Sequence, residues 1–168
     1  LSFVHGDIRD EALVREVVAG VDVIVNAAAE SHVEKSIAEG ASEFVATNVQ
    51  GTRVLLDAIR EVSVDRFILI SSSEVYGTAE RAPMDEAHPL KPVDVNGIHK
   101  IAGEMYHQLY AQVYGLATCV LRLTNTYGPG QLVKHARQGV MGWFLRRVVE
   151  REPLEVMGDG DQLRDLNY

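Results

Sequence analysis

The sequence predicts an α/β fold, in which a doubly wound parallel sheet is covered by helices on both faces. Three observations lead to this fold class. Short runs of apolar, β-branched residues alternate along the chain with longer segments of helical periodicity. The runs are apolar throughout, as is typical of strands that are buried on both faces of a parallel sheet. Polar and glycine-containing stretches follow the runs, at the sheet edge where α/β proteins bind ligands.

Each predicted element follows from one of these two periodicities. The apolar runs predict strands, which we place at residues 3–4, 22–28, 66–71, 117–123 and, more weakly, 154–158. The helical periodicity predicts helices at residues 10–20, 43–62, 97–115 and 140–152. One long loop, residues 78–94, precedes the third helix, and loops of this length in compact domains are more often functional than idle.

Composition narrows the class of protein. The 168 residues are 46% hydrophobic, which is enough for one globular domain. Acidic residues outnumber basic ones by 24 to 16, and the net charge of −8 argues against binding to nucleic acid. No apolar run reaches the roughly 18 residues that span a membrane, and the histidines lack the spacing of metal ligands, so we expect neither a membrane nor a metal as partner. Cys119 is the single cysteine, which fits a reducing, cytoplasmic setting.

Both ends of the chain lack the signals of a complete protein. The chain begins at Leu1, inside a strand-like run and without an initiator methionine, and it stops at Tyr168 without a terminating signal. We therefore interpret the sequence as an internal fragment.

Polar residues follow each of the main predicted strands. Asp7, in "GDIRD", either accepts a hydrogen bond from an exocyclic amine or lies in a turn. The alanines of "NAAAESH" leave room either for a flat ligand or for close packing of a helix on the sheet. In "SSSEVYG", residues 71–74 offer three hydroxyls and a carboxylate; helix capping is the alternative, although no strong helical pattern follows. Asn125, in "TNTYGPG", offers both a donor and an acceptor.

Seven motifs occur in register along the chain: "GDIRD", "NAAAESHVEKSI", "TNVQGT", "SSSEVYG", a lysine that opens a long helix, "LRLTNTYGPGQ" and "GDGDQLRD". Together they resemble the extended short-chain dehydrogenase/reductase family, in particular its NAD-dependent epimerases and dehydratases that modify nucleotide sugars. The resemblance covers essentially the whole chain.

This resemblance implies a Rossmann-like fold that binds NAD, with NADP left open because the residue that discriminates the two lies upstream. Residues 1–168 would be a partial NAD(P)-binding domain, in which residues 125–168 begin the substrate-binding part. The family's glycine-rich turn, which binds the pyrophosphate at a helix N-terminus, would precede Leu1, and the rest of the substrate region would follow Tyr168.

The resemblance also implies a role for individual residues at the matching positions of the motifs. The residues expected to bind the cofactor are Asp7, Ile8, Ala27, Ala28, Ala29, Asn48 and Lys100. Those expected to bind the substrate are Ser72, Ser73, Asn125 and Arg164, the last because a guanidinium suits phosphate oxygens. The expected catalytic set is Ser72, Glu74, Asn96 and Lys100.

Asn96 departs from the family's pattern. Relatives carry Tyr-x-x-x-Lys, and the residue four positions before Lys100 is Asn96, whose carboxamide cannot ionise to act as the general base. Three hypotheses follow. Another group replaces the base, with Glu74 first and His99 second; or Asn96 orients substrate or water in a rearranged site; or the protein binds a nucleotide sugar or NAD without redox turnover.

The expected reaction is that of a nucleotide-sugar epimerase similar to UDP-glucose 4-epimerase, which oxidises the sugar transiently and makes the fewest extra chemical demands. A nucleotide-sugar decarboxylase is the first alternative. A 4,6-dehydratase is less favoured, because Ser73 and Glu74 stand where dehydratases carry an Asp-Glu pair. The expected partners are a nucleoside-diphosphate sugar and, for the full-length protein, a second copy in a homodimer.

Overall fold

The computed structural model describes residues 1–31, 40–131, 133, 139–156, 158–161 and 163–168. The chain divides into two compact units, Leu1–Arg122 and Leu123–Tyr168. We describe each unit by itself.

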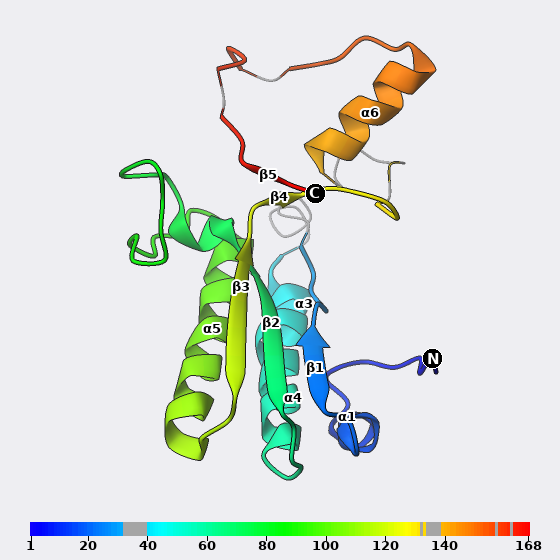
Figure 1. The fold of residues 1–168 in the computed structure, drawn as a ribbon, viewed down its shortest axis with the longest axis vertical. Coiled ribbons are helices and arrows are strands. Elements are labelled where there is room, and N and C mark those ends of the chain that lie inside the picture. Colours follow the sequence, from blue (N-terminus) through cyan, green and yellow to red (C-terminus); the bar gives the residue numbers. More distant parts are fainter. Residues whose placement is uncertain (32–39, 132, 134–138, 157, 162) are drawn as a thin grey trace. The chain divides into compact units, whose positions relative to one another are not determined.

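The first unit is built on a three-stranded sheet, drawn as arrows in Figure 1. Strand order is β1 (Val23–Asn26), β2 (Arg66–Ser72) and β3 (Thr118–Leu123), which follows the chain. β1 and β2 run parallel in a register that pairs Val25 with Ile68. A helical crossover joins each strand to the next, so the sequence prediction of a parallel α/β sheet is confirmed.

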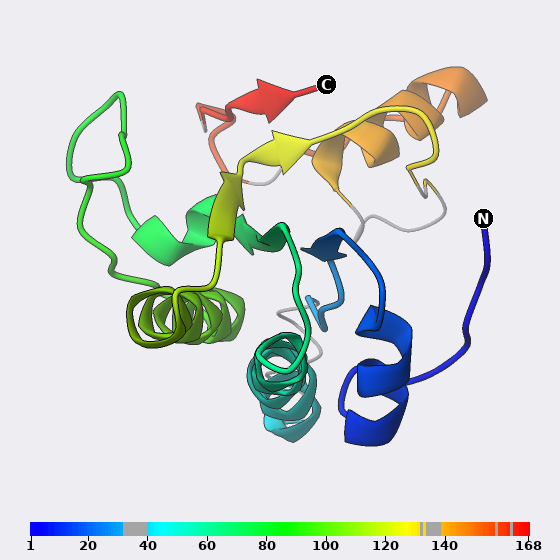
Figure 2. The ribbon, with the colours of Figure 1, turned by 60° about the horizontal axis from the view of Figure 1, so that its bottom comes forward.

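Helices α1 (Glu11–Val18), α4 (Thr52–Ile59) and α5 (Val95–Tyr114) lie along one face of this sheet, which Figure 2 shows end-on. Along β2, buried side chains alternate with more exposed ones, and the buried side chains are those of Phe67, Leu69 and Ser71. The hydrophobic core of the unit is formed by side chains of these elements: Val14, Val18, Val54, Leu55, Leu56, Ala58, Ile59, Phe67 and Tyr110.

The other face of the sheet also carries apolar residues. Val23 and Val25 are 51% and 56% exposed in β1, and Leu121 is 41% exposed in β3. Apolar side chains on both faces are the pattern of a sheet that is covered on both sides.

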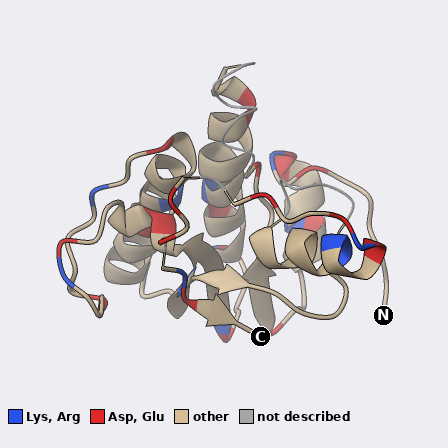
Figure 3. Ribbon diagram, turned by 90° about the horizontal axis from the view of Figure 1, so that it is seen from above, with Lys and Arg blue, Asp and Glu red and all other residues tan. Residues whose placement is uncertain are grey.

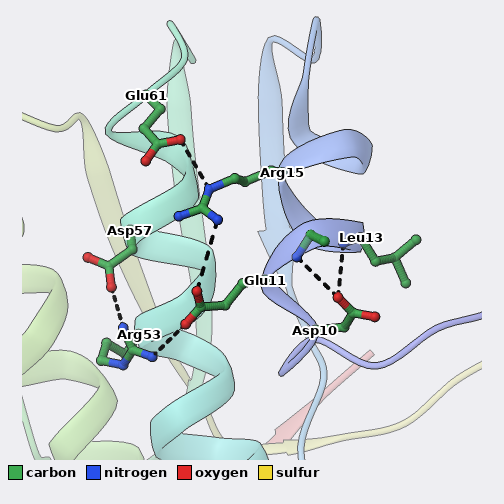
Figure 4. Close-up of polar contacts among 8 residues, drawn as sticks. Asp10, Glu11, Leu13, Arg15, Arg53, Asp57 and Glu61 are labelled. Carbon is green, nitrogen blue, oxygen red and sulfur yellow. Dashed lines mark hydrogen bonds and ion pairs between the residues drawn. The ribbon is translucent and has the colours of Figure 1, made fainter.

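A polar ladder joins α1 to α4 (Figure 4). Asp10 caps α1, because its carboxylate accepts hydrogen bonds from the backbone N–H groups of residues 12 and 13. Glu11 lies between Arg53 of α4, 3.2 Å away, and Arg15 of its own helix, which in turn reaches Glu61 at 3.1 Å. These side chains are about half exposed, so the ion pairs orient the two helices and stabilise them little.

The helix predicted over residues 43–62 is interrupted. It begins as α3 (Ser42–Phe44), continues as a π-helical segment, η1 (Val45–Gly51), and becomes α4 only at Thr52. Helical periodicity in a sequence does not distinguish a π-helical turn from an α-helical one, and π-turns are rare and frequently found at functional sites.

The long helix α5 has well-defined ends. Asp94 caps its first turn by accepting a hydrogen bond from the N–H of Gly97 at 2.8 Å, and Gly115 ends it in the left-handed conformation, with φ of 71°. Gly97 also allows a close approach. A Cβ at this position would lie 2.7 Å from the carbonyl oxygen of Glu74 and 2.8 Å from Cβ of Pro92. The first turn of α5 therefore packs directly on the segment that follows β2.

The second unit contains β4 (Asn125–Thr126), β5 (Leu166–Asn167) and α6 (Val140–Glu150). The two short strands pair in parallel. On α6, the guanidinium groups of Arg146 and Arg147 lie 5.9 and 5.1 Å from the ring centre of Trp143.

Two predicted strands do not form. Residues 3–4 have no strand conformation, and Phe3 is 87% exposed; residues 154–156, the described start of the weak prediction, are likewise irregular. Runs of two or three apolar residues do not specify a strand without a partner strand to complete their hydrogen bonds. None of the described helices is long and apolar enough to cross a membrane.

Candidate functional site

The predicted catalytic residues of the first unit gather at the carboxyl end of β2. Here Ser72 ends the strand and a short 3₁₀ helix, η2 (Ser73–Tyr76), begins. The hydroxyl of Ser72 accepts a hydrogen bond from the N–H of Glu74 at 3.2 Å. The capping alternative considered for this motif is thus present, in a 3₁₀ rather than an α-helix. Capping uses one lone pair of the hydroxyl and leaves its proton available to another partner.

Asn96 and Glu74 are hydrogen-bonded to each other. The side-chain N–H of Asn96, in the first turn of α5, donates to a carboxylate oxygen of Glu74 in η2. Asn96 is 6% exposed, whereas Glu74 is exposed. The carbonyl oxygen of the Asn96 side chain is buried without a hydrogen-bond partner among the described residues. The amide of Asn96, which stands at the sequence position where the family's pattern has a tyrosine, therefore holds the carboxylate of Glu74.

Lys100 lies one helical turn after Asn96, and its ammonium donates to the carbonyl oxygen of Ile70 in β2 at 2.7 Å. Burial lowers the pKa of Lys100, while the nearby carboxylates of Glu74 and Glu104 act in the opposite direction. The lysine is thus held at the sheet edge with the catalytic candidate Glu74 inside its electrostatic reach.

A small pocket next to Lys100 joins several elements of the first unit. It is lined by Ala28, Asn48, Thr52, Leu69, His99, Lys100 and Gly103. His99 is 7% exposed, its Nδ1 has no partner among the described residues, and burial lowers its pKa. His99 and Lys100 are neighbours in the sequence and both line this pocket. Among the described residues, no hydrogen bond joins His99 to Ser72 or Glu74.

Asn48 holds the loop after β1. From within the π-helical segment, its side chain accepts from the N–H of Glu30 and donates to the carbonyl oxygen of the same residue, both at 2.8 Å. This pair of bonds mimics a strand pairing and fixes the loop that begins with Ala27 and Ala28, which are exposed. Ala29 is half-buried. Small exposed side chains beside Lys100 fit a flat ligand such as a nicotinamide dinucleotide.

Asp7 and Ile8 precede α1. Arg9 holds the carboxylate of Asp7 through its guanidinium and its backbone N–H, and these hydrogen bonds lower the pKa of Asp7. Ile8 packs against Gly51, where a Cβ would overlap its side chain. The turn alternative for Asp7 is thus seen directly, and any ligand amine at this position would share the carboxylate with Arg9.

Asn125 and Arg164 belong to the second unit. The side-chain N–H of Asn125 donates to the carbonyl oxygen of Asp165 at 3.2 Å, which joins β4 to the residue that follows Arg164. The two predicted substrate ligands therefore belong to one unit, Asn125 at the start of β4 and Arg164 two residues before β5. Ser73, the remaining predicted ligand, is half-buried in the first turn of η2.

Sequence reasoning missed a buried ionic network beneath the site. Glu104 of α5, one turn after Lys100, is 8% exposed. Its carboxylate accepts hydrogen bonds from Nε and Nη2 of Arg122 in β3. Ser71 donates to the same carboxylate at 2.5 Å. The signal was present in the sequence: Arg122 interrupts the apolar run "TCVLRL", and a charged residue inside a buried strand requires a partner.

The site as a whole offers a carboxylate, a hydroxyl and an ammonium at one sheet edge, which suits proton transfer at a hydroxyl group of a ligand. No cluster of three or more metal-binding side chains occurs among the described residues. An α/β domain with such a group beside a small-residue loop is the class in which dinucleotide-dependent enzymes are found.

Comparisons with known proteins define the class further. The model of the NAD dependent epimerase/dehydratase family matches residues 1–168. The low-salt glycan biosynthesis protein Agl12 of Haloferax volcanii is 43% identical over 166 residues, which are 99% of this chain and 52% of that protein.

Two solved structures show the same fold. A UDP-glucose 4-epimerase from Thermotoga maritima, solved with UDP-glucose, has a TM-score of 0.91 at 31% identity and covers 98% of this chain and 54% of its own. A double mutant of the dTDP-glucose 4,6-dehydratase DesIV from Streptomyces venezuelae, solved with NAD bound, has a TM-score of 0.86 at 38% identity, with 99% and 50% covered.

The chain therefore belongs to the NAD-dependent epimerase/dehydratase family, and its fold is Rossmann-like. It spans about half the length of the relatives that it matches. Family membership confirms the resemblance drawn from the seven motifs and the cofactor class, NAD; the roles of the individual site residues stay predictions.

Proposed function

We propose that the full-length protein is a nucleotide-sugar epimerase, an isomerase that oxidises a sugar hydroxyl transiently and returns the hydride to the other face. The observation that carries this proposal is the hydrogen bond between Asn96 and Glu74, beside Ser72 and Lys100. It supplies a fixed, exposed carboxylate where the usual tyrosine is missing.

In the proposed reaction, Ser72 holds the sugar hydroxyl and Glu74 takes its proton. The C–H bond of the same carbon breaks at that moment, and bound NAD supplies the chemistry of accepting the hydride. Glu74 returns the proton when the hydride comes back to the keto sugar, so no net oxidation or reduction occurs. Lys100 binds the cofactor ribose and stabilises the charges of this proton transfer.

Cofactor binding is proposed for the loop after β1 and for the start of the chain. Asp7 and Ile8 would flank the adenine, and Ala27, Ala28 and Ala29 would line the dinucleotide. Asn48, which already holds this loop through Glu30, would keep it at a fixed distance from Lys100. The exposure of Ala27 and Ala28 supports this assignment.

The second unit is proposed to begin the substrate-binding part of the protein. Asn125 and Arg164 would bind the diphosphate of the nucleotide sugar, because amide N–H groups and a guanidinium fork both donate to phosphate oxygens. Ser73 would contact the sugar from the first unit.

A homodimer is proposed through α5. Ile98, Met105, Leu109 and Val113 are 49–65% exposed on this helix, and their spacing places them along one stripe. Tyr106, Tyr110 and Tyr114 form a separate stripe on this helix, and Tyr110 is part of the core. A second copy that packs its own α5 on the apolar stripe would cover it.

The proposed setting is cytoplasmic, since Cys119 is half-buried and the sequence has no second cysteine with which to form an internal disulfide. The distribution of charged residues is consistent with an enzyme that acts on a small molecule, because Figure 3 shows acidic and basic residues interspersed along the described ribbon.

A 4,6-dehydratase is the second candidate, and the 38% identity to a dTDP-glucose 4,6-dehydratase favours it. The two reactions differ in product. Elimination of water needs an acid and a base in addition to the redox pair, and η2 offers only Glu74 after Ser73. We therefore place the dehydratase second.

The test is a product assay with the full-length protein. UDP-glucose, UDP-glucuronate and dTDP-glucose are incubated separately, with NADH absorbance and sugar products followed over time. A 4-epimer as product supports the proposal, a 4-keto-6-deoxy sugar supports the dehydratase, and loss of CO₂ supports a decarboxylase. Bound cofactor without a product or transient reduction would show that the protein binds these ligands without turnover.

A further inference from the structure

Four side chains outside the predicted site form one continuous network. At its centre is the pair Glu104–Arg122, in which Nη2 of Arg122 lies 2.7 Å from the carboxylate and Nε lies 3.1 Å from the same oxygen. Nη1 of Arg122 donates to the hydroxyl of Tyr76 at 3.0 Å, and Ser71 donates to Glu104. Arg122 of β3 thus bonds to α5 and η2, and Glu104 joins β2 to the same network through Ser71.

Three of the four side chains in this network are buried, and Arg122 is half-buried. Glu104 is 8% exposed, Tyr76 is 7% exposed and Ser71 is 4% exposed, so water competes little for their hydrogen bonds. The guanidinium of Arg122 also lies 5.0 Å from the ring centre of Tyr76, whose ring meets His88 edge-on. His88 is 2% exposed in the loop that precedes α5.

The network holds both ends of the segment that carries the proposed catalytic groups. Ser71 directly precedes Ser72, and Tyr76 follows Glu74 by two residues. Both therefore fix η2 from its two sides, and both are fixed by the same ion pair.

The same pair is tied to the helix on the other side of the site. Glu104 follows Lys100 by one turn of α5 and Asn96 by two turns, so its side chain shares their face. The hydrogen bond between Asn96 of α5 and Glu74 of η2 can form only if these two elements keep a fixed position relative to each other. Only the first turn of α5 and this buried pair join the two elements through polar side chains that the structure describes.

We propose that Glu104 and Arg122 are positioning residues, which hold η2 on α5 so that Asn96 keeps the carboxylate of Glu74 beside Ser72. This proposal rests on the proposed function, because it names what sets the geometry of that same site. In this proposal Arg122, Glu104, Tyr76 and Ser71 set the position of the catalytic groups, in addition to contributing to the packing of the fold.

Removal of one charge alone would not test this role, because an uncompensated buried charge destabilises the fold by itself. The informative variant replaces both residues with methionine, Glu104→Met with Arg122→Met, which removes both charges and keeps similar volume. The matched control is Arg15→Met with Glu61→Met, an exposed ion pair that is 3.1 Å long and far along the chain from the site residues.

We expect the single variant Arg122→Met to lose both stability and activity, and the double variant to regain the urea midpoint of the wild type to a large extent. Its kcat should nevertheless stay about 10–100-fold low, since a displacement of 1 Å at a catalytic group has that order of effect, while KM changes less than about threefold. The control pair should leave kcat and KM unchanged. A double variant with wild-type kcat would overturn the proposal.

Hydrogen exchange separates this result from a failure of the proposed function. Backbone amides of residues 73–76 should exchange faster in the double variant than in the wild type, with no such change in the control pair. This readout needs no substrate, so it stands even if the wild type turns over none of the sugars tested. Unchanged exchange at residues 73–76 would overturn the positioning role.

Discussion

His107 of α5 should make the protein less stable in acid. Its ring is 1% exposed and stacks on Phe67, with ring centres 4.6 Å apart. Neither ring nitrogen has a hydrogen-bond partner among the described residues. Burial lowers the pKa of His107 from 6.5 to about 4, and the negative charge of Glu104 opposes this only in part.

The sign of the effect follows from proton binding. The unfolded chain protonates this imidazole near pH 6.5, whereas the folded chain does so only near pH 4, so the unfolded state binds more protons between these values. Stability contributed by the neutral ring is therefore complete above about pH 6.5 and decreases as the pH falls to about 4. At about 1.4 kcal/mol per pH unit, the loss over this range amounts to about 3 kcal/mol.

The assay is urea unfolding of the full-length protein at pH 7 and at pH 4.5, for the wild type and for His107→Phe. Other groups titrate over the same range, so the comparison is between the two proteins at each pH. The wild type should lose about 2–3 kcal/mol more than the variant. His5→Gln, at an exposed position, is the control and should behave like the wild type. Equal losses in the wild type and His107→Phe would refute the reasoning.

Three further substitutions test the local geometry. Gly97→Ala should lower kcat at least tenfold, because its Cβ would displace the backbone of Glu74; steady-state kinetics measures this, and wild-type kcat would contradict it. Asp10→Ala should lower the free energy of unfolding by about 1 kcal/mol through loss of the α1 cap, measured by urea titration. Arg15→Ala should change it by less than about 0.5 kcal/mol, since its ion pairs are exposed; a loss as large as that of Asp10→Ala would contradict this ranking.

The sequence predicted the main strands and helices because their signals are local. The helix predicted at residues 97–115 is observed as Val95–Tyr114, with Asp94 as its cap. The predicted start is two residues late, because Val95 and Asn96 are not strong helix formers and tertiary contact overrides that preference here. The π-helical segment is not predictable, because helical periodicity does not distinguish a π-helical turn from an α-helical one. The hydrogen bonds between Asn48 and the backbone of Glu30 likewise depend on the fold.

The site was predicted in part for the same reason. The motif positions located Ser72, Glu74 and Lys100, and the spacing showed that Asn96 replaces a tyrosine. That Asn96 donates to Glu74 required the packing of α5 on η2, which no sequence pattern specifies. The pairing of Glu104 with Arg122 likewise joins positions 18 residues apart through the fold.

The most direct test of the central claim is the rate of Glu74→Gln in the full-length protein, measured with the nucleotide sugar that the wild type turns over. Glutamine keeps the shape of the side chain and cannot take the proton. The account predicts that kcat falls by about 10²–10⁴-fold, while NAD and the nucleotide sugar still bind. A Glu74→Gln variant that turns over at the wild-type rate would contradict it.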